Sequence, residues 1–233
     1  MKVIIAGATG YIGQEILSQC LAHPSITSIV ALTRRELNIQ NKNDKLRTHI
    51  MTDADFLSFS DPKLTEELKG ASACLWAIGL RPSKAGNDER TRQISMDYPA
   101  AAAAGFQRAF TAGSDSVSPP APGGKFRFVY ISGAGVERNQ NQSLWYMGDF
   151  RRLRGETENV LFRHAEANAD VFETYIMRPG LVPSSKGTLI DRLWSLAPSV
   201  RLDLLVKTMI DVALNGNEKT TFENQMIREW GAR

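Results

Sequence analysis

Residues 1–13 read Met-Lys-Val-Ile-Ile-Ala-Gly-Ala-Thr-Gly-Tyr-Ile-Gly, an apolar run that ends in three glycines with the spacing G-x-x-G-x-x-G. The uninterrupted apolar residues from Val3 predict a buried strand. A helix that packs on one face is predicted after the glycines, from the spacing of Ile12, Ile16, Leu17 and Leu21. A strand, a glycine turn and a helix in this order indicate the first unit of a dinucleotide-binding sheet; the alternative is a purely structural turn.

Each glycine of this turn has its own expected role. Gly7 allows a sharp turn after the strand, Gly10 lets the backbone approach a pyrophosphate, and Gly13 lets the helix pack close to the strand. The N-terminus of the helix then faces the phosphates with its N–H groups and the positive end of its dipole. The cofactor contacts predicted in this stretch are Gly7, Thr9, Gly10, Tyr11, Ile12 and Gly13.

The bulk composition is that of an ordinary globular protein. The chain has 233 residues, of which 42% are hydrophobic, and a net charge of +3. This length fits a single α/β domain over residues 1–233, with residues 181–233 as a small substrate-side lobe. The small net charge gives no indication of a nucleic-acid or membrane-surface partner.

Two features of the sequence predict a cytoplasmic location. Cys20 and Cys74 are too few for a disulfide framework, and this usage is typical of a reducing compartment. The N-terminus has no charged-then-apolar signal segment, and no stretch of about 18 consecutive apolar residues predicts a membrane span.

Apolar runs and helical patterns alternate along the first 180 residues. Further strands are predicted at residues 26–32, 46–51, 73–78, 126–131 and 171–177. Helices are predicted at 61–69, 91–112 and 144–164, with a surface loop at 113–124. This alternation predicts an α/β fold, a doubly wound, mostly parallel sheet with helices on both faces.

Ligands of such sheets bind outside the carboxyl ends of the strands, so the residues that follow each strand are candidates. Arg34 and Arg35 follow the second strand, where guanidinium groups favour the 2′-phosphate of NADP over the ribose diol of NAD; a solvated basic turn is the alternative. Asp53 follows the third strand and is expected to bound an adenine pocket or to cap a turn. Ala77, Ile78 and Gly79 follow the fourth strand and are expected beside the cofactor ribose.

Five segments together resemble the atypical short-chain dehydrogenase/reductase superfamily, which has a Rossmann NAD(P)-binding domain, and in particular its compact NmrA-like and HTATIP2-like members. These segments are Gly7-Ala-Thr-Gly10-Tyr-Ile-Gly13, Trp76-Ala-Ile-Gly79, Phe128-Val-Tyr-Ile-Ser132, Arg154-Gly-Glu-Thr-Glu158 and Arg178-Pro-Gly180. The resemblance covers residues 1–182 and implies a nicotinamide cofactor, NADP(H) rather than NAD(H) on account of the two arginines.

The resemblance also implies a Tyr-x-x-x-Lys pair on the long helix, with the tyrosine as proton donor. The register of the Arg154-Gly-Glu-Thr-Glu158 segment puts Phe150 at the tyrosine position and Arg154 at the lysine position. Phenylalanine has no proton to give, whereas Arg154 keeps a charge that could hold a ribose hydroxyl but cannot shuttle protons. The alternative is a core stripe of Phe150, Leu153, Thr157, Val160 and Leu161 with Arg154 at its edge.

Two groups are candidates to replace the missing acid. Tyr146 is expected one helical turn before Phe150, and the alternative is a wedge at the start of the helix. Ser132 resembles the family's substrate-polarising serine, although many relatives have a second serine where this chain has Gly133. The catalytic candidates are therefore Ser132, Tyr146 and Arg154.

The substrate side is the least specified part of the predicted site. Pro179, with Gly180, is expected to turn the chain over the nicotinamide. An apolar cleft is expected to follow, lined by Leu181, Val182, Trp194 and Leu196, and a hydrophobic core explains these residues equally well. No metal site is predicted, because the three histidines lack metal-ligand spacing.

Three classes of function fit these residues. The first is an NADPH-dependent reductase of a small, apolar, conjugated or carbonyl substrate that works without the tyrosine. The second is a redox-neutral isomerase, epimerase-like enzyme or cyclase of secondary metabolism. The third is a non-catalytic NADP sensor like NmrA. The resemblance further implies a homodimer formed through the long helix.

Overall fold

The computed structural model describes residues 1–37, 43–80, 89–111, 124–183 and 198–233. Its strands are β1 (Lys2–Ala6), β2 (Ser28–Thr33), β3 (Leu46–Ile50), β4 (Ala71–Trp76), β5 (Phe126–Ile131), β6 (Phe172–Arg178) and β7 (Thr221–Glu223). Among these residues the strands form one sheet in the order β3-β2-β1-β4-β5-β6-β7, and all pairings are parallel. The predicted α/β fold with a parallel sheet is confirmed.

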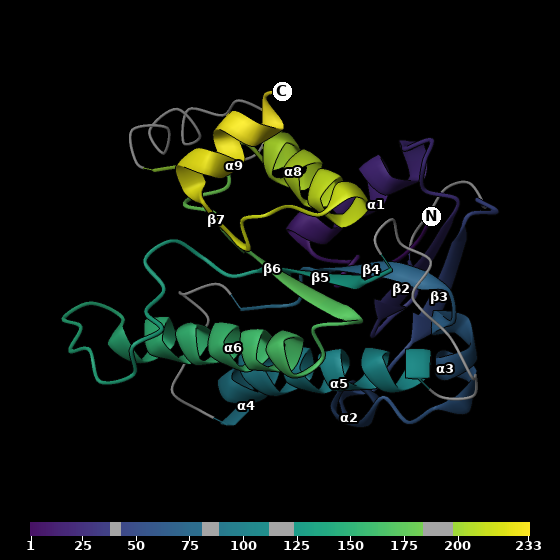
Figure 1. Cartoon of the computed structure of the whole chain (residues 1–233), viewed down its shortest axis with the longest axis horizontal. Helices are drawn as coiled ribbons and strands as arrows, with labels where there is room; N and C mark the ends of the chain where they lie inside the picture. Colours follow the sequence, from purple (N-terminus) through teal and green to yellow (C-terminus); the bar gives the residue numbers. More distant parts are fainter. Residues whose placement is uncertain (38–42, 81–88, 112–123, 184–197) are drawn as a thin grey trace.

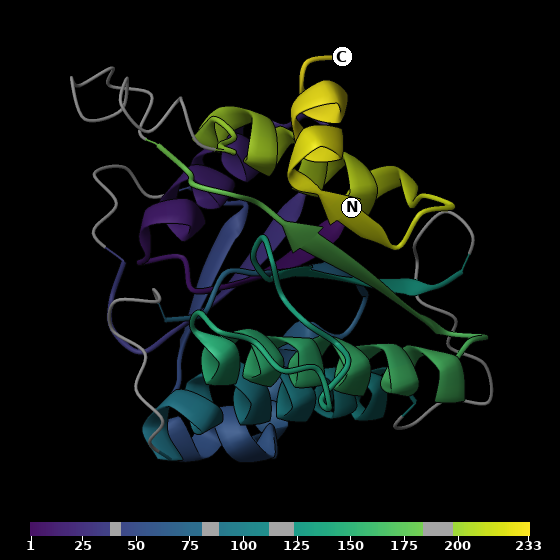
Figure 2. The same cartoon turned by 90° about the vertical axis from the view of Figure 1, so that its left-hand side faces the viewer.

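The helices cover both faces of this sheet. They are α1 (Tyr11–Ala22), α2 (Asp53–Ser58), α3 (Pro62–Leu68), α4 (Glu89–Arg92), the π-helical turn η2 (Gln93–Asp97), α5 (Tyr98–Thr111), α6 (Gly148–Ala167), α8 (Leu202–Asn215) and α9 (Asn224–Gly231). Figure 1 shows α1, α8 and α9 on one side of the sheet and α2 to α6 on the other. The view in Figure 2 shows the sheet enclosed between these two layers.

Alternate residues of the central strand β1 pack against the two helical layers. Ile4 and Ala6 belong to the core under α5 and α6, whereas Val3 and Ile5 belong to the core under α1 and α8. Side chains of successive strand residues point to opposite faces, so a strand covered on both sides is apolar throughout. This burial explains why β1 appears in the sequence as an uninterrupted apolar run.

The described part of the C-terminal segment belongs to the sheet and to one of its two helical layers. Helix α8 packs beside α1 and over β4 and β5, and strand β7 pairs with β6 at the edge of the sheet. The strand–helix alternation therefore continues beyond residue 181, although the sequence predicted it only along the first 180 residues. Residues 184–197, including Trp194 and Leu196 of the predicted cleft, lie outside the described residues.

The long helix α6 begins later than predicted. Met147 has a left-handed backbone with φ of 48°, and the helix starts at Gly148 instead of Leu144. Near the middle of the helix, a Cβ on Gly155 would lie 1.7 Å from the carbonyl oxygen of Glu137. The loop that leads into α6 therefore passes directly against the helix, and Gly155 is required for this contact.

The direction of the chain across the sheet reverses between β1 and β4. The first three strands run outward from β1 to β3, and the chain then returns to place β4 on the other side of β1. The carboxyl ends of β1 and β4 therefore form the topological switch point, which is where open α/β sheets bind their ligands.

Candidate functional site

The glycine turn occupies this switch point. Gly7 has a φ of +89°, and a Cβ at this position would lie 2.9 Å from the carbonyl carbon of Ala77, which follows β4. A Cβ on Gly13 would lie 1.9 Å from the carbonyl oxygen of Gly7, so α1 packs directly on the turn. A Cβ on Gly10 would meet only the Gly7 oxygen, at 3.2 Å. Gly7 and Gly13 are therefore needed by the turn itself, whereas Gly10 is exposed and a Cβ there would be close to one backbone atom only.

Helix α1 begins immediately after this open position. Gly10 is its N-cap, and among the described residues no side chain caps the helix. Thr9 lies in the turn and is partly buried, Tyr11 is 40% exposed, and Ile12 packs at the margin of the core. A helix N-terminus without a capping side chain presents backbone N–H groups and a positive dipole end to an anion.

Arg34 and Arg35 both lie exposed after β2, the strand next to β1. The guanidinium Nη1 of Arg34 is 3.7 Å from Oδ1 of Asp53, the first residue of α2. Such an exposed ion pair is weak and leaves Arg34 available to a stronger anion.

Asp53 is the centre of a small polar network. Its carboxylate accepts a hydrogen bond from the Tyr98 hydroxyl at 2.7 Å and pairs with Arg90 at 2.9 Å. The hydrogen bonds from Arg90 and Tyr98 lower the pKa of Asp53 below its usual value. The alternative that Asp53 caps a turn is wrong, because Thr52 is the N-cap of α2 and forms a capping box with Asp55.

Ala77, Ile78 and Gly79 continue from β4 at the other side of the switch point. The amide of Ala77 donates to the carbonyl of Ala6 at 2.9 Å, which holds this segment against the glycine turn. Gly79 is exposed, and a Cβ there would lie 3.2 Å from Nη2 of Arg154. This segment therefore joins the glycine turn to the buried face of α6.

Arg154 is held among the strand ends by two backbone carbonyls. Its Nη1 donates to the carbonyl oxygen of Ser132 at 2.6 Å, and its Nη2 donates to that of Leu80 at 3.0 Å. The ring of Phe150 stacks on the guanidinium, with 4.9 Å from the ring centroid to Cζ. Arg154 is 9% exposed and therefore lies on the buried face of α6, whereas the core-stripe alternative put it at the edge.

The two proposed substitutes for the missing acid are placed differently from expectation. The helical register assumed for Tyr146 is wrong, because this residue precedes α6 and the left-handed Met147. Tyr146 is 59% exposed, and its ring lies against the 97% exposed Trp145. Ser132 is buried, and its hydroxyl donates to Oε1 of Glu158 at 2.6 Å.

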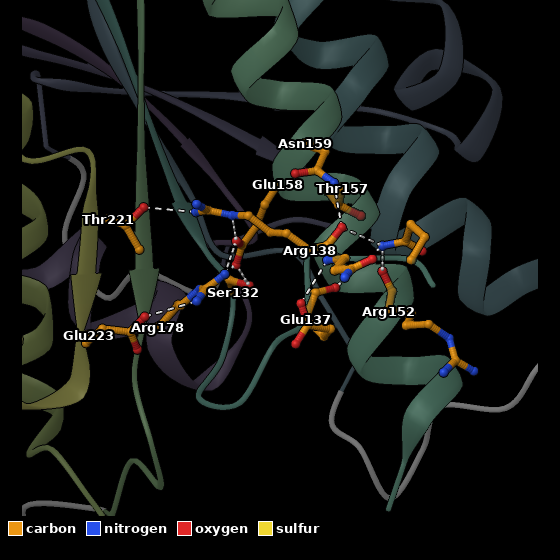
Figure 3. Close-up of polar contacts among 12 residues, drawn as sticks. Ser132, Glu137, Arg138, Arg152, Thr157, Glu158, Asn159, Arg178, Thr221 and Glu223 are labelled. Atoms are coloured by element: carbon orange, nitrogen blue, oxygen red, sulfur yellow. Dashed lines mark hydrogen bonds and ion pairs between the residues drawn. The ribbon is translucent and has the colours of Figure 1, made fainter. Parts of the chain in front are cut away.

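Glu158 has no counterpart among the predicted site residues, and it anchors the largest charged network beside the site (Figure 3). Its side chain is fully buried, and its carboxylate pairs with Arg138 at 2.6 Å and with Arg178 at 2.5 Å. Although burial alone lowers the pKa of Arg178, the hydrogen bond and charge of Glu158 raise it overall. Arg178 also reaches Glu223 of β7 at 3.0 Å.

The remaining predicted residues that the structure describes follow β6. Pro179 is buried after β6, and its carbonyl accepts from the amide of Ala134 at 2.8 Å, which joins the loops after β5 and β6. Leu181 is 42% exposed, and Val182 packs against the core under α8. Among the described residues, no cluster of histidine, cysteine or acidic side chains has the arrangement of a metal site.

Solved structures with this fold include several dehydrogenases. A short-chain dehydrogenase from Burkholderia cenocepacia, in complex with NADP, matches with a TM-score of 0.68 and 12% identity over 99% of this chain and 92% of that one. Gre2 from Candida albicans, in complex with NADPH, matches with a TM-score of 0.65 and 16% identity over 96% of this chain and 77% of that one. The chain has the short-chain dehydrogenase/reductase fold. The resemblance seen in its sequence is thereby confirmed.

Two curated relatives match parts of the sequence. Protein FMP52, mitochondrial, of Candida albicans is 32% identical over 45% of this chain and 45% of its own length. Protein fmp52-1, mitochondrial, of Aspergillus terreus is 26% identical over 79% of this chain and 68% of its own length. The match thus spans less than half of the Candida relative. No family model matches the chain.

These relatives correct one expectation from the sequence. Both are named mitochondrial, which contradicts the predicted cytoplasmic location. None of the helices in the described part of the chain is long and apolar enough to cross a membrane. Cysteine usage was a poor guide to location, because a reducing environment is not confined to one compartment.

Proposed function

We propose that this short-chain dehydrogenase/reductase-like chain is an NADP(H)-dependent reductase of a small conjugated substrate. The observation that carries the proposal is the glycine turn at the switch point of the sheet. Gly7 and Gly13 leave no room for a Cβ, whereas Gly10 is exposed at the start of a helix without a capping side chain. A pyrophosphate fits this arrangement, because the backbone can approach it closely and the helix supplies N–H groups.

The preference for NADP(H) rests on the residues after β2. Arg34 and Arg35 are both exposed there, and guanidinium groups bind a phosphate through paired hydrogen bonds. Solved structures of this fold include complexes with NADP, with NADPH and with NAD, so the preference rests on the two arginines alone.

The choice of a conjugated substrate follows from the missing proton donor. The bound nicotinamide would supply a hydride, and this chain must orient the acceptor and handle the charge that develops on it. Phe150 has no acidic proton, and the Ser132 hydroxyl is directed to Glu158. Conjugated acceptors spread the developing charge over several atoms, so they can take their proton from water.

Nucleotide titration tests this proposal directly. Calorimetric titration with NADPH, NADP⁺ and NADH should show tight binding of the first two and weaker binding of NADH. Absence of binding to all three nucleotides would exclude the reductase and the NADP sensor together. A panel of quinones, flavins and enones should then oxidise bound NADPH. Binding without oxidation by any acceptor would favour the redox-neutral enzyme or the sensor.

The names of the curated relatives support a mitochondrial location for this chain as well. Fractionation of cells that express the chain with a C-terminal tag should recover it with mitochondria. Recovery in the cytosolic fraction alone would contradict this part of the proposal.

A further inference from the structure

In the part of the chain that the structure describes, Arg154 is a buried cation without a carboxylate partner. Among these residues its guanidinium donates to the carbonyl oxygens of Ser132 and Leu80, and its buried Nε has no hydrogen-bond partner. Within the described residues no acidic side chain lies within ion-pair distance of it. Burial of a charge without a counter-charge is costly, so this arrangement favours a ligand that brings negative charge.

The neighbouring arginines of the site, unlike Arg154, are paired with a carboxylate. Arg138 and Arg178 both pair with the fully buried Glu158, which compensates their charge. Arg154 lies one helical turn before Glu158 on α6, yet the two are not paired. The uncompensated charge is therefore a specific property of Arg154 and not of the whole cluster.

The position of Arg154 connects it to the nucleotide end of the site. Leu80, which accepts from Nη2, follows the segment of Ala77 to Gly79 that packs against the glycine turn. Cβ atoms on Gly79 and Gly133 would lie 3.2 and 3.8 Å from the two Nη atoms. The two glycines leave the flanks of the guanidinium without side chains. The ring of Phe150 stacks on the guanidinium and fixes its orientation.

A guanidinium can stabilise an anion but cannot supply a proton at ordinary pH. Reduction of a simple ketone forms an alkoxide, which needs a proton donor close by. Reduction of an α,β-unsaturated ketone is different: hydride adds to the β-carbon, the π electrons of the C=C bond shift, and the carbonyl oxygen becomes an enolate oxygen. The nicotinamide is oxidised, and water then gives a proton to the α-carbon and leaves hydroxide.

We propose that Arg154 binds the enolate oxygen formed during conjugate reduction, which makes α,β-unsaturated ketones the substrate class of this site. The proposal rests on the proposed reductase function. It assigns Arg154 the stabilisation of developing charge, with no proton transfer through its side chain. A preorganised, largely buried cation stabilises such charge more strongly than an exposed one does.

Binding of 4-nitrophenol with NADP⁺ tests the charge preference without turnover. Its phenolate imitates an enolate, and its ionisation is visible by absorbance. Bound to the wild-type protein, the phenol should show an apparent pKa lower than in solution by about 1 to 3 units. Arg154→Gln should abolish this shift. Arg163→Gln, which removes an exposed arginine of the same helix, should retain it.

The outcomes separate this inference from the reductase proposal. If the wild-type protein binds NADP⁺ but leaves the phenol unbound or its pKa unchanged, the role of Arg154 is overturned and nucleotide binding stands. If nucleotide does not bind, both proposals fail. The wild-type measurement alone decides the matter if Arg154→Gln does not fold.

A matched pair of substrates tests the same inference by activity. 2-Cyclohexenone should be reduced by NADPH, whereas cyclohexanone should not. Arg154→Gln should lower kcat for the enone by about 100- to 1,000-fold, as loss of an oxyanion-stabilising group does. Arg154→Lys, which keeps the charge, should retain more activity than Arg154→Gln. Equal rates for the two variants, or preferential reduction of cyclohexanone, would contradict the proposal.

Discussion

The hydroxyl of Ser132 donates a hydrogen bond to Oε1 of Glu158 at 2.6 Å, and both groups are buried. Ser132 follows β5 and Glu158 belongs to α6, so the bond joins the end of a central strand to the helix above it. The proton of the serine is directed toward the carboxylate. A hydroxyl held in this way is not free to donate to a substrate carbonyl, which was its expected role.

Ser132→Ala should therefore affect stability more than catalysis. A hydrogen bond to a charged group contributes about 1.5–3 kcal/mol, so the free energy of unfolding should fall by that amount. The kcat for an enone should fall less than tenfold. Urea denaturation and steady-state kinetics on the same preparation check both parts. A loss of activity of 100-fold or more with unchanged stability would restore Ser132 as a catalytic residue.

Replacement of the carboxylate itself should be far more damaging. Glu158→Gln leaves Arg138 and Arg178 without their buried counter-charge, so the free energy of unfolding should fall by about 3–5 kcal/mol. The matched control is Glu156→Gln, a partly exposed residue of the same helix whose carboxylate lies 3.6 Å from Arg92 of α4. This change should cost about 1 kcal/mol or less. Similar denaturation midpoints for the two variants would contradict the structural role of Glu158.

Substitutions in the glycine turn should separate an effect on NADPH affinity from an effect on the stability of the fold. A Cβ on Gly10 would lie 3.2 Å from a single atom, the Gly7 carbonyl oxygen, so Gly10→Ala should fold with a modest loss of thermal stability and lose at least tenfold in NADPH affinity. A Cβ on Gly13 would lie 1.9 Å from the Gly7 oxygen, so Gly13→Ala should be severely destabilised. Thermal denaturation and calorimetry measure the two effects. Unchanged nucleotide affinity in Gly10→Ala would show that the turn does not hold the pyrophosphate.

Local patterns were sufficient to predict the sheet and its turn. Strands buried on both faces leave uninterrupted apolar runs, and the glycines after β1 are separated by fixed steps. Strand β7 was not predicted from the sequence, because it has only three residues and only Phe222 among them is buried. Helix α2 was not predicted for a similar reason, since it has six residues and Phe56 is its only buried side chain.

The Glu158 network could not be predicted, because helix patterns assign charged residues to the solvent side. The two arginine partners of Glu158 come from a loop and from β6, each 20 residues away in sequence, so only the folded chain brings them together. One signal was present in the sequence. Gly155 lies inside the long helix, and a glycine in such a position indicates close approach of another segment, here Glu137.

The pKa of Asp53 predicts a contribution to stability that depends on pH. Hydrogen bonds from Arg90 and Tyr98 lower this pKa below the ordinary 3.8. A carboxyl with a depressed pKa in the folded state stabilises the protein above its unfolded pKa, and this contribution is lost as pH falls through the folded value.

Asp53→Asn should thus be less stable than the wild type at pH 7, and the two should converge below about pH 3.8. The effect should be small, because the carboxylate is 44% exposed and solvent screens it. Urea denaturation from pH 3 to pH 7 measures the difference, with the exposed Asp170→Asn as the control. A difference that persists unchanged at low pH would exclude the ionised Asp53 as its source.

The carboxylate of Asp53 lies beside Arg34, which we expect to determine the preference for NADP(H) over NAD(H). Arg34 is 3.7 Å from Asp53 across a solvent-exposed gap, so a 2′-phosphate can take over the guanidinium at little cost. Arg34→Ala removes a charge-assisted hydrogen bond worth about 1.5–3 kcal/mol, which corresponds to a loss in NADPH affinity of about 10- to 150-fold. Affinity for NADH, which lacks this phosphate, should change less than threefold.

Calorimetric titration of wild type and Arg34→Ala with NADPH and NADH measures this difference. The control Arg228→Ala, on the exposed side of α9, should change the affinity for neither nucleotide. Equal losses for NADPH and NADH would mean that Arg34 supports the fold of the site and does not read the 2′-phosphate.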